Sequence, residues 1–194
     1  MDSLTGQQLL GKDEKVVSAD SILEDKRIIA FYFSAHWCPP CRWADSPAHV
    51  LLCWFANVFP RLFTPLLTEF YSDLVTSGGE PFEIVFVSSD KTPEDMMTYM
   101  KESHGDWLAV QHATVLAQQL KKKFSVTGIP TLIVVNRRVV WPHHSPSLTW
   151  NNCRKGEVIS RNGRSEVVEK GPQVFQKWIA NATWIVFVKF IQWF

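Results

Sequence analysis

Hydrophobic residues along this chain fall into short runs and helix-spaced stripes that predict alternating strands and helices. Ile28 to Phe33 is an unbroken apolar run, typical of a strand buried on both faces, and Ile84 to Val87 repeats the pattern. Between them, the apolar residues of the segment from Phe63 to Val75 keep a helical spacing. Strand, helix and strand in this order predict a parallel βαβ unit.

The remaining segments extend the alternation. Thr92 is a candidate N-cap with Pro93 at the first helical position, and this helix should end at Gly105. Met96, Tyr99 and Met100 are expected to form its apolar stripe. An edge strand and a short helix are predicted within residues 1–26, and a further helix over 113–124. Strands are predicted at Leu132 to Val135 and at Glu157 to Ser160, followed by a turn at Asn162-Gly163. Gly171-Pro172 opens a last helix, which carries on one face Val174, Phe175, Trp178, Ile179 and Ala182.

This order of elements predicts an α/β fold with a central mixed β-sheet and helices on both faces. The length of 194 residues fits one domain, which we place at residues 1–183. Residues 184–194 form an apolar tail that is too short for a membrane-spanning helix, which needs about 20 residues. The start of the chain does not look like a signal peptide. We therefore expect a reducing compartment, the cytoplasm first and the nucleus second.

A Cys-x-x-Cys pair, Cys38 and Cys41, follows directly after the first buried strand. Two thiols at this spacing can close a disulfide, and the first, near unpaired N–H groups at a helix start, is stabilised as a thiolate. Half of a zinc site is the alternative reading. Structural zinc needs two further ligands, however, and Cys53 and Cys153 stand alone. The pattern therefore favours redox chemistry without a metal or cofactor.

Two other clusters are better explained without a ligand. His143 and His144, with Cys153, lack a fourth metal ligand, so we expect a loop there. The basic run Lys121 to Lys123 could contact nucleic acid, but it closes a predicted helix, where cations are favoured by the helix dipole. A formal net charge of +1 gives no further reason to expect a nucleic-acid partner.

The segment from Phe31 to Arg42, with Trp-Cys-Pro-Pro-Cys at its centre, resembles the thioredoxin superfamily. The Phe-Ser-Ala-His that precedes Trp37 resembles its tryparedoxin and nucleoredoxin branch. Further matching segments are Val85 to Asp90, Trp107 to Val110 and Phe124 to Thr131, and the likeness covers residues 1 to about 182. The resemblance implies a thioredoxin-like fold.

The resemblance also implies roles for individual residues. Cys38 would be the exposed thiol that attacks a client disulfide, and Cys41 would resolve the mixed disulfide. Ile129-Pro130 would be the family's cis-proline loop, which lies against the cysteines and offers backbone groups to a substrate. Trp37 would flank the site as a contact surface, or pack against the sheet edge. Thioredoxins proper carry a buried acid where this chain has Tyr32, so proton transfer from Cys41 must use water or another group.

Two stretches, residues 43–61 and 138–154, have no counterpart in the pattern of relatives, and we interpret them as insertions. Relatives continue from the Cys-Pro-Pro-Cys motif into one helix. Here Ser46-Pro47 predicts the start of a separate apolar helix that Pro60 should end. The second stretch falls at a predicted hairpin tip, where a longer loop costs little free energy.

These observations favour a dithiol-disulfide oxidoreductase. Its expected partners are disulfide-containing protein clients, with a peroxidase as one candidate, and an upstream thiol reductant. The alternative is a redox-inactive trophic or binding factor that uses the fold as an interaction surface. A peroxidase in its own right is a third, weaker reading. Resemblance to the nucleoredoxin-like proteins implies a role in maintaining photoreceptors and other sensory neurons.

Overall fold

The structure is a computed structural model of the chain that describes residues 4–39, 41, 63–77, 79, 81–136, 157–161 and 173–178. Residues 43–61 and 138–154, the tail 184–194 and the Asn162-Gly163 turn lie outside the described residues, so the predictions made for them stay predictions. Among the helices that are described, none has the length and apolar character needed to cross a membrane.

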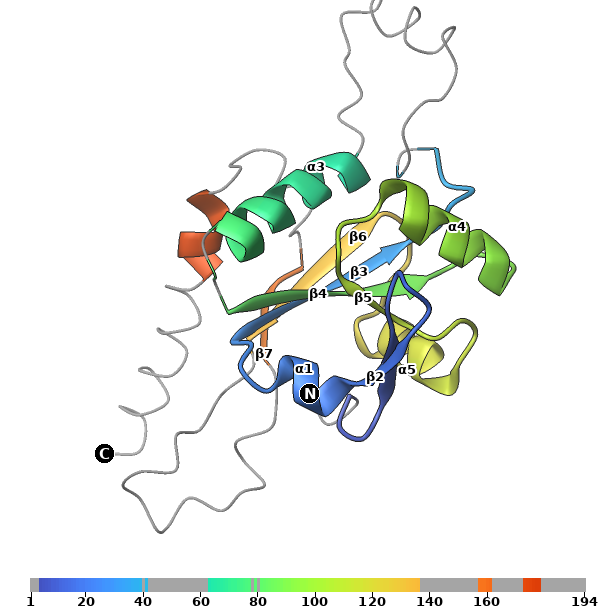
Figure 1. Cartoon of the computed structure of the whole chain (residues 1–194), viewed down its shortest axis with the longest axis horizontal. Helices are drawn as coiled ribbons and strands as arrows, with labels where there is room; N and C mark the ends of the chain where they lie inside the picture. Colours follow the sequence, from blue (N-terminus) through green and yellow to red (C-terminus); the bar gives the residue numbers. More distant parts are fainter. Residues whose placement is uncertain are drawn as a thin grey trace, which may run out of the picture.

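A seven-stranded mixed β-sheet forms the centre of the described structure (Figure 1). Its middle strand, β3 (Ile28–Ser34), pairs in parallel with β4 (Phe82–Ser88) and antiparallel with β6 (Thr131–Asn136). Every residue of β3 and β4 is buried. An uninterrupted apolar sequence is what a strand covered on both faces requires. The predicted central strands and the predicted fold class are therefore confirmed.

Short strands complete the sheet on both sides, in the order β2-β1-β5-β4-β3-β6-β7. β5 (Leu108–Val110) is parallel to β4, whereas β1 (Gln8–Leu10), β2 (Val16–Ser18) and β7 (Glu157–Ser160) each pair antiparallel with a neighbour. No strand was predicted at β5, and one strand rather than two was predicted for the N-terminal segment. Three residues are too few for a strand periodicity, and β5 finds its backbone partners on β4 and β1, which flank it in the sheet.

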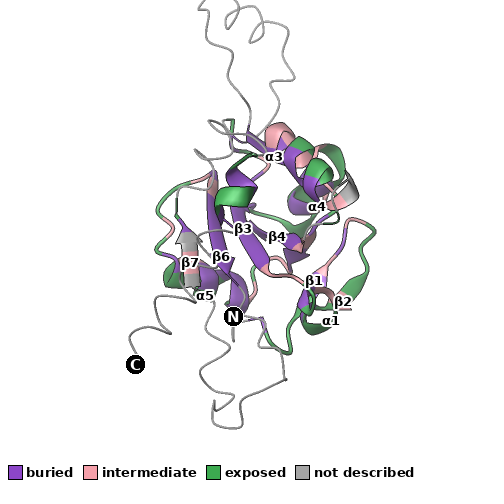
Figure 2. Cartoon of the chain, turned by 90° about the vertical axis from the view of Figure 1, so that its left-hand side faces the viewer, coloured by how far each residue is buried: buried purple, intermediate pink, exposed green. Residues whose placement is uncertain are grey.

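Helices cover both faces of the sheet (Figures 1 and 2). α3 (Phe63–Tyr71) continues into a π-helix, η1 (Ser72–Ser77). α3 and η1 pack on one face of the sheet, together with α4 (Pro93–Ser103) and helical residues 173–178. α1 (Ala19–Leu23) and α5 (Val115–Lys123) pack on the other face. The buried hydrophobic residues accordingly form two clusters, one on each side of the sheet.

The local signals for the helices hold where the structure describes them. The Thr92 hydroxyl accepts a hydrogen bond from the Asp95 N–H at 3.1 Å, which confirms Thr92 as the N-cap of α4. In the last helix, Val174, Phe175 and Trp178 are buried as predicted. Ile179 and Ala182 lie outside the described residues.

Glu83, on β4, is a buried carboxyl group that contacts the last residue of α3. Its Oε1 accepts hydrogen bonds from the Tyr71 hydroxyl and the Ile84 N–H, both at 3.0 Å. Burial raises the pKa of Glu83 to about 7, although these two bonds and the nearby Lys26 favour the charged form. The side chain is therefore held partly protonated near neutral pH.

We expect Glu83→Gln to stabilise the folded protein above pH 7 and to change little at pH 4.5. The pKa in the folded state exceeds that in the unfolded state, so stability is lost as pH rises from 4.5 to about 7. The difference between the two pKa values predicts that the substitution raises the free energy of unfolding at pH 8 by an amount on the order of 3 kcal/mol, because Gln accepts the same hydrogen bonds without ionising. Urea unfolding at pH 4.5 and at pH 8 measures this change in stability, and substitution of the exposed Glu69 by Gln is the control. Equal effects of Glu83→Gln at the two pH values would contradict the buried titration.

Candidate active site

The two cysteines lie where β3 ends and the chain turns toward the helices. Their sulfur atoms are joined in a disulfide, with Cα atoms 5.3 Å apart. Two turn bonds shape the segment, from the Cys38 N–H to the Ala35 carbonyl at 3.2 Å and from the Cys41 N–H to the Cys38 carbonyl at 3.0 Å. The buried strand thus ends in a tight turn that brings both predicted redox residues together.

The expected exposure of Cys38 is not what the structure shows. Cys38 is 3% exposed and Cys41 is fully buried. The Cys38 sulfur is bonded to Cys41 on one side and lies 3.9 Å from the Ile129 carbonyl oxygen. In the disulfide state, these neighbours cover the sulfur that the sequence pattern placed at the surface.

The Ile129-Pro130 loop lies against the cysteines. The peptide bond between these two residues is cis, as the resemblance implies. Pro130 is buried directly before β6, and the Thr131 hydroxyl donates to the Gly128 carbonyl at 2.7 Å. The loop is thereby held so that the Ile129 carbonyl faces the Cys38 sulfur.

Trp37 projects beside the disulfide and is 57% exposed. Its indole N–H donates to the Ser89 carbonyl at 3.0 Å, so one edge of the ring is attached to the loop after β4. Trp37 thus combines both expected features, an exposed ring face and attachment beside the end of β4. Among the described residues, the large hydrophobic side chains that are exposed are Val16, Trp37 and Val115.

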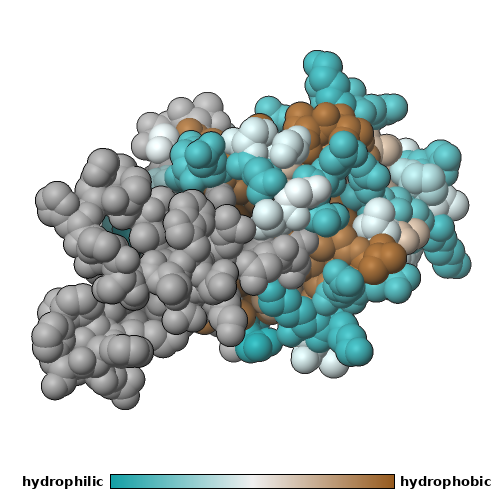
Figure 3. Space-filling model, turned by 90° about the horizontal axis from the view of Figure 1, so that it is seen from below, coloured by the Kyte–Doolittle hydropathy of each residue, from teal (hydrophilic) through white to brown (hydrophobic). Residues whose placement is uncertain are grey.

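Figure 3 shows hydrophobic residues, in brown, bordered by hydrophilic ones, in teal, on one face of the molecule.

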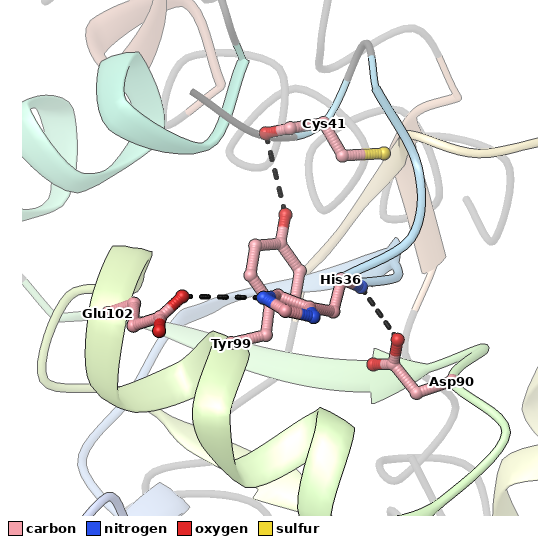
Figure 4. A network of polar contacts seen from close by, with 5 residues as sticks. All are labelled: His36, Cys41, Asp90, Tyr99 and Glu102. Atoms are coloured by element: carbon pink, nitrogen blue, oxygen red, sulfur yellow. Dashed lines mark hydrogen bonds and ion pairs between the residues drawn. The ribbon is translucent and has the colours of Figure 1, made fainter. Parts of the chain in front are cut away.

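An open cavity of about 410 Å³ lies next to Trp37. Its lining residues are His36, Trp37, Asp90, Lys91 and Asp95. The Asp90 carboxylate accepts from the His36 N–H at 2.6 Å (Figure 4). It also accepts from the Ser88 hydroxyl at 2.8 Å, and the two bonds fix the turn before the cysteines. In the sequence, Asp90 stood out only as part of a segment that matches the family. Its partner His36 is half-buried and reaches Glu102 at 3.3 Å, rather than facing solvent freely.

Lys121 has a structural contact that the sequence did not indicate. Its ammonium group donates to the Ser88 carbonyl at 2.9 Å, and burial lowers its pKa. Lys122 and Lys123 are exposed at the end of α5, as expected for a solvated helix end. One cation of the basic run therefore supports the loop that carries Asp90.

Buried hydroxyl groups surround the backbone of Cys41. The Thr64 hydroxyl donates to the Cys41 carbonyl at 2.6 Å, and the Tyr99 hydroxyl approaches the same oxygen at 3.4 Å (Figure 4). Tyr32 lies 2.7 Å from the Thr64 hydroxyl. Burial raises the pKa of Tyr32 and of Tyr99, so both remain protonated near neutral pH. Only Tyr32 was singled out from the sequence, through its place in the motif.

His104, at the end of α4, contributes to the same interior. Its Nδ1 accepts from the Trp107 indole at 3.2 Å, and its ring lies 4.3 Å from that of Tyr99, between centroids. Burial holds the pKa of His104 well below its usual value, so the imidazole is neutral. No sequence signal distinguished this histidine.

The described residues hold no group of three His, Cys, Asp or Glu side chains placed to bind a metal ion. Cys38 and Cys41, which were considered as half of a zinc site, are paired with each other. His143, His144, Cys53 and Cys153 lie outside the described residues.

Comparison with known proteins gives consistent matches. A family model described as thioredoxin-like matches residues 25–139. The chain is 34% identical to nucleoredoxin of Mus musculus, in a match that covers 72% of this chain and 23% of that protein. It is 35% identical to tryparedoxin of Trypanosoma brucei brucei, in a match that covers 74% of this chain and 73% of the tryparedoxin. The chain thus spans about a quarter of the length of the nucleoredoxin.

Among solved structures, thioredoxin related protein 16 of Carcinoscorpius rotundicauda superposes with a TM-score of 0.65. The two are 41% identical, and the match covers 92% of this chain and 99% of that one. Native tryparedoxin I of Crithidia fasciculata gives a TM-score of 0.61 at 30% identity, covering 88% and 91%.

Proposed function

Because the chain belongs to the thioredoxin-like family, with nucleoredoxins and a tryparedoxin among its relatives, we propose that it reduces protein disulfides through Cys38 and Cys41. The observation that carries the proposal is the Cys38–Cys41 disulfide at the end of β3. A dithiol that closes into a disulfide within one turn can pass two electrons to a client.

The exchange needs two steps. In the reduced protein, the Cys38 thiolate attacks one sulfur of a client disulfide, which breaks the client bond and releases the other client sulfur as a thiolate. Cys41 then loses its proton and attacks the Cys38 sulfur, releasing the second client thiol. The client gains two electrons and the protein ends as the disulfide seen in the structure. An upstream thiol reductant restores the dithiol.

The surroundings of Cys38 support its role as the attacking residue. It keeps 3% exposure whereas Cys41 has none, and the Ile129 carbonyl faces its sulfur. A client segment could pair with the backbone of the Ile129-Pro130 loop while its disulfide meets Cys38. The exposed ring of Trp37 offers a flat contact surface beside that path.

In its motifs, the chain resembles nucleoredoxin-like protein 2, also called rod-derived cone viability factor 2. We extend the proposal on that basis to redox protection and maintenance of photoreceptors and other sensory neurons, in the cytoplasm or nucleus. Client candidates include a peroxidase that accepts electrons from Cys38 and Cys41.

The low exposure of Cys38 favours a second candidate function. A factor that binds partners through its surface and leaves the disulfide closed would use the same fold without turnover. Trp37 would then serve as a contact residue alone.

Reduction of insulin disulfides separates the two functions. We expect wild type to reduce insulin with dithiothreitol as electron source, and Cys38→Ser to fall to the uncatalysed background. Cys53→Ser, which keeps both site cysteines, is the matched control and should retain the wild-type rate. A folded wild type that does not exceed the background would favour the binding factor.

A further inference from the structure

We propose that Thr64 is a positioning residue that holds the resolving cysteine, Cys41, in place for disulfide exchange. It acts through a hydroxyl cluster, which we define as the side chains of Tyr32, Ser34, Thr64 and Tyr99. The inference rests on the proposed function and deepens it, because it concerns the second cysteine of the same reaction.

The backbone of Thr64 occupies a helical position relative to Cys41. Its N–H donates to the Cys41 carbonyl at 3.3 Å, a bond that comes from the fourth following residue in an α-helix. Thr64 lies 23 positions after Cys41, which is 19 more than four. The stretch from Trp43 to Arg61 is also 19 residues long. Thr64 therefore stands where the fourth residue would stand if one helix ran on from Cys41.

A side-chain bond reinforces this backbone contact. The Thr64 hydroxyl donates to the Cys41 carbonyl at 2.6 Å, so residue 64 supplies two donors to one oxygen. In a continuous helix, three intervening residues would hold the two residues in register. Here the connection in sequence is far longer, and the hydrogen bonds of Thr64 maintain the register instead.

The other hydroxyls direct their donors toward the same point. Each hydroxyl has a single hydrogen, and Thr64 uses its own on Cys41. The Tyr32 hydroxyl, at 2.7 Å, then donates to the Thr64 oxygen. The Tyr99 hydroxyl shares its one hydrogen between that oxygen, at 2.6 Å, and the Cys41 carbonyl, at 3.4 Å, and Ser34 donates to Tyr99 at 3.0 Å. All four residues are buried. Such a chain of bonds is mutually reinforcing, and it connects Cys41 to β3, α3 and α4.

Fixing Cys41 matters for the resolving step. The Cys41 sulfur must reach the Cys38 sulfur in line with the bond that breaks, and a preplaced nucleophile gains a high effective concentration. Without the Thr64 hydroxyl, Cys41 would sample more positions in the reduced state. The Cys38–Cys41 disulfide would then form less favourably.

The test is the thiol-disulfide equilibrium of the purified full chain with glutathione. We expect Thr64→Val, which keeps the shape but loses the hydroxyl, to lower the equilibrium constant for disulfide formation about tenfold. A tenfold change corresponds to a potential about 30 mV less negative. Thr64→Ser restores the hydroxyl and should return the potential to that of wild type.

Thr68→Val is the matched control. The Thr68 hydroxyl lies one turn further along α3 and shares its one hydrogen between the Thr64 and Ser103 carbonyls, at 3.0 and 3.1 Å. Loss of this bond should weaken folding without moving the potential. Equal shifts in Thr64→Val and Thr68→Val, or no shift in either, would overturn the positioning role.

Tyr99→Phe keeps the proposal testable if Thr64→Val does not fold. It removes a donor to Thr64 and should shift the potential in the same direction by a smaller amount; an unchanged potential would then overturn the proposal. The equilibrium needs no client. A shift in Thr64→Val together with a wild type inactive on insulin would therefore reject the proposed function and keep the role of Thr64.

Discussion

Serine in place of Cys41 should trap client proteins on Cys38 as mixed disulfides. The attacking thiol remains, whereas a serine hydroxyl cannot displace the client sulfur, so the first step proceeds and the second stops. Insulin turnover should fall to background. Because Cys41 is held through its carbonyl oxygen, which serine retains, the fold around it should persist.

The adducts can be counted directly. Purified Cys41→Ser protein, incubated with cell extract, should give bands on non-reducing gels that dithiothreitol removes. Cys38→Ser should give none, and the double variant should behave like Cys38→Ser. Adducts of equal yield from Cys41→Ser and the double variant would show that a thiol other than Cys38 attacks clients, and would refute the assignment.

Deletion of residues 43–61 should raise both the solubility and the disulfide-reductase rate. Joining Arg42 to Leu62 makes Thr64 the fourth residue after Cys41, in agreement with the helical bond already present between them. A helix running unbroken from Cys41 would hold its N-terminal amides behind Cys38 and stabilise the thiolate. The helix-terminus effect predicts a rate about two- to fivefold higher.

The deletion also removes an apolar stripe. Val50, Leu51, Trp54, Phe55 and Val58 share a helical face in the sequence, and both faces of the described sheet are already covered by helices. Insulin assays, the pH dependence of Cys38 alkylation and size-exclusion chromatography measure the three effects. Deletion of 138–154, at the hairpin tip between β6 and β7, is the control and should leave the rate unchanged. A deleted form that is less soluble and no faster would show that residues 43–61 belong to the fold.

Several elements could be predicted because their signals are local. β3 and β4 appear as unbroken apolar runs since each is buried on both faces, and α4 carries its cap and first-turn proline within three residues. The cysteine pair follows β3 directly, so its place at the strand end follows from the chain itself. β5 could not be predicted, because three residues carry no periodicity and the strand exists only through its partners β4 and β1.

The sequence by itself determined the central strands, the start of α4 and the position of the redox pair, since each depends on residues close together along the chain. Only the tertiary structure decided what surrounds that pair. Cys38 is covered by a loop 91 positions away, and the hydroxyls around Cys41 come from β3, α3 and α4. Hydrogen bonds and burial depend on distances in space, and residues such as Thr64 and Tyr99 carry no local pattern that records which neighbours folding will bring to them.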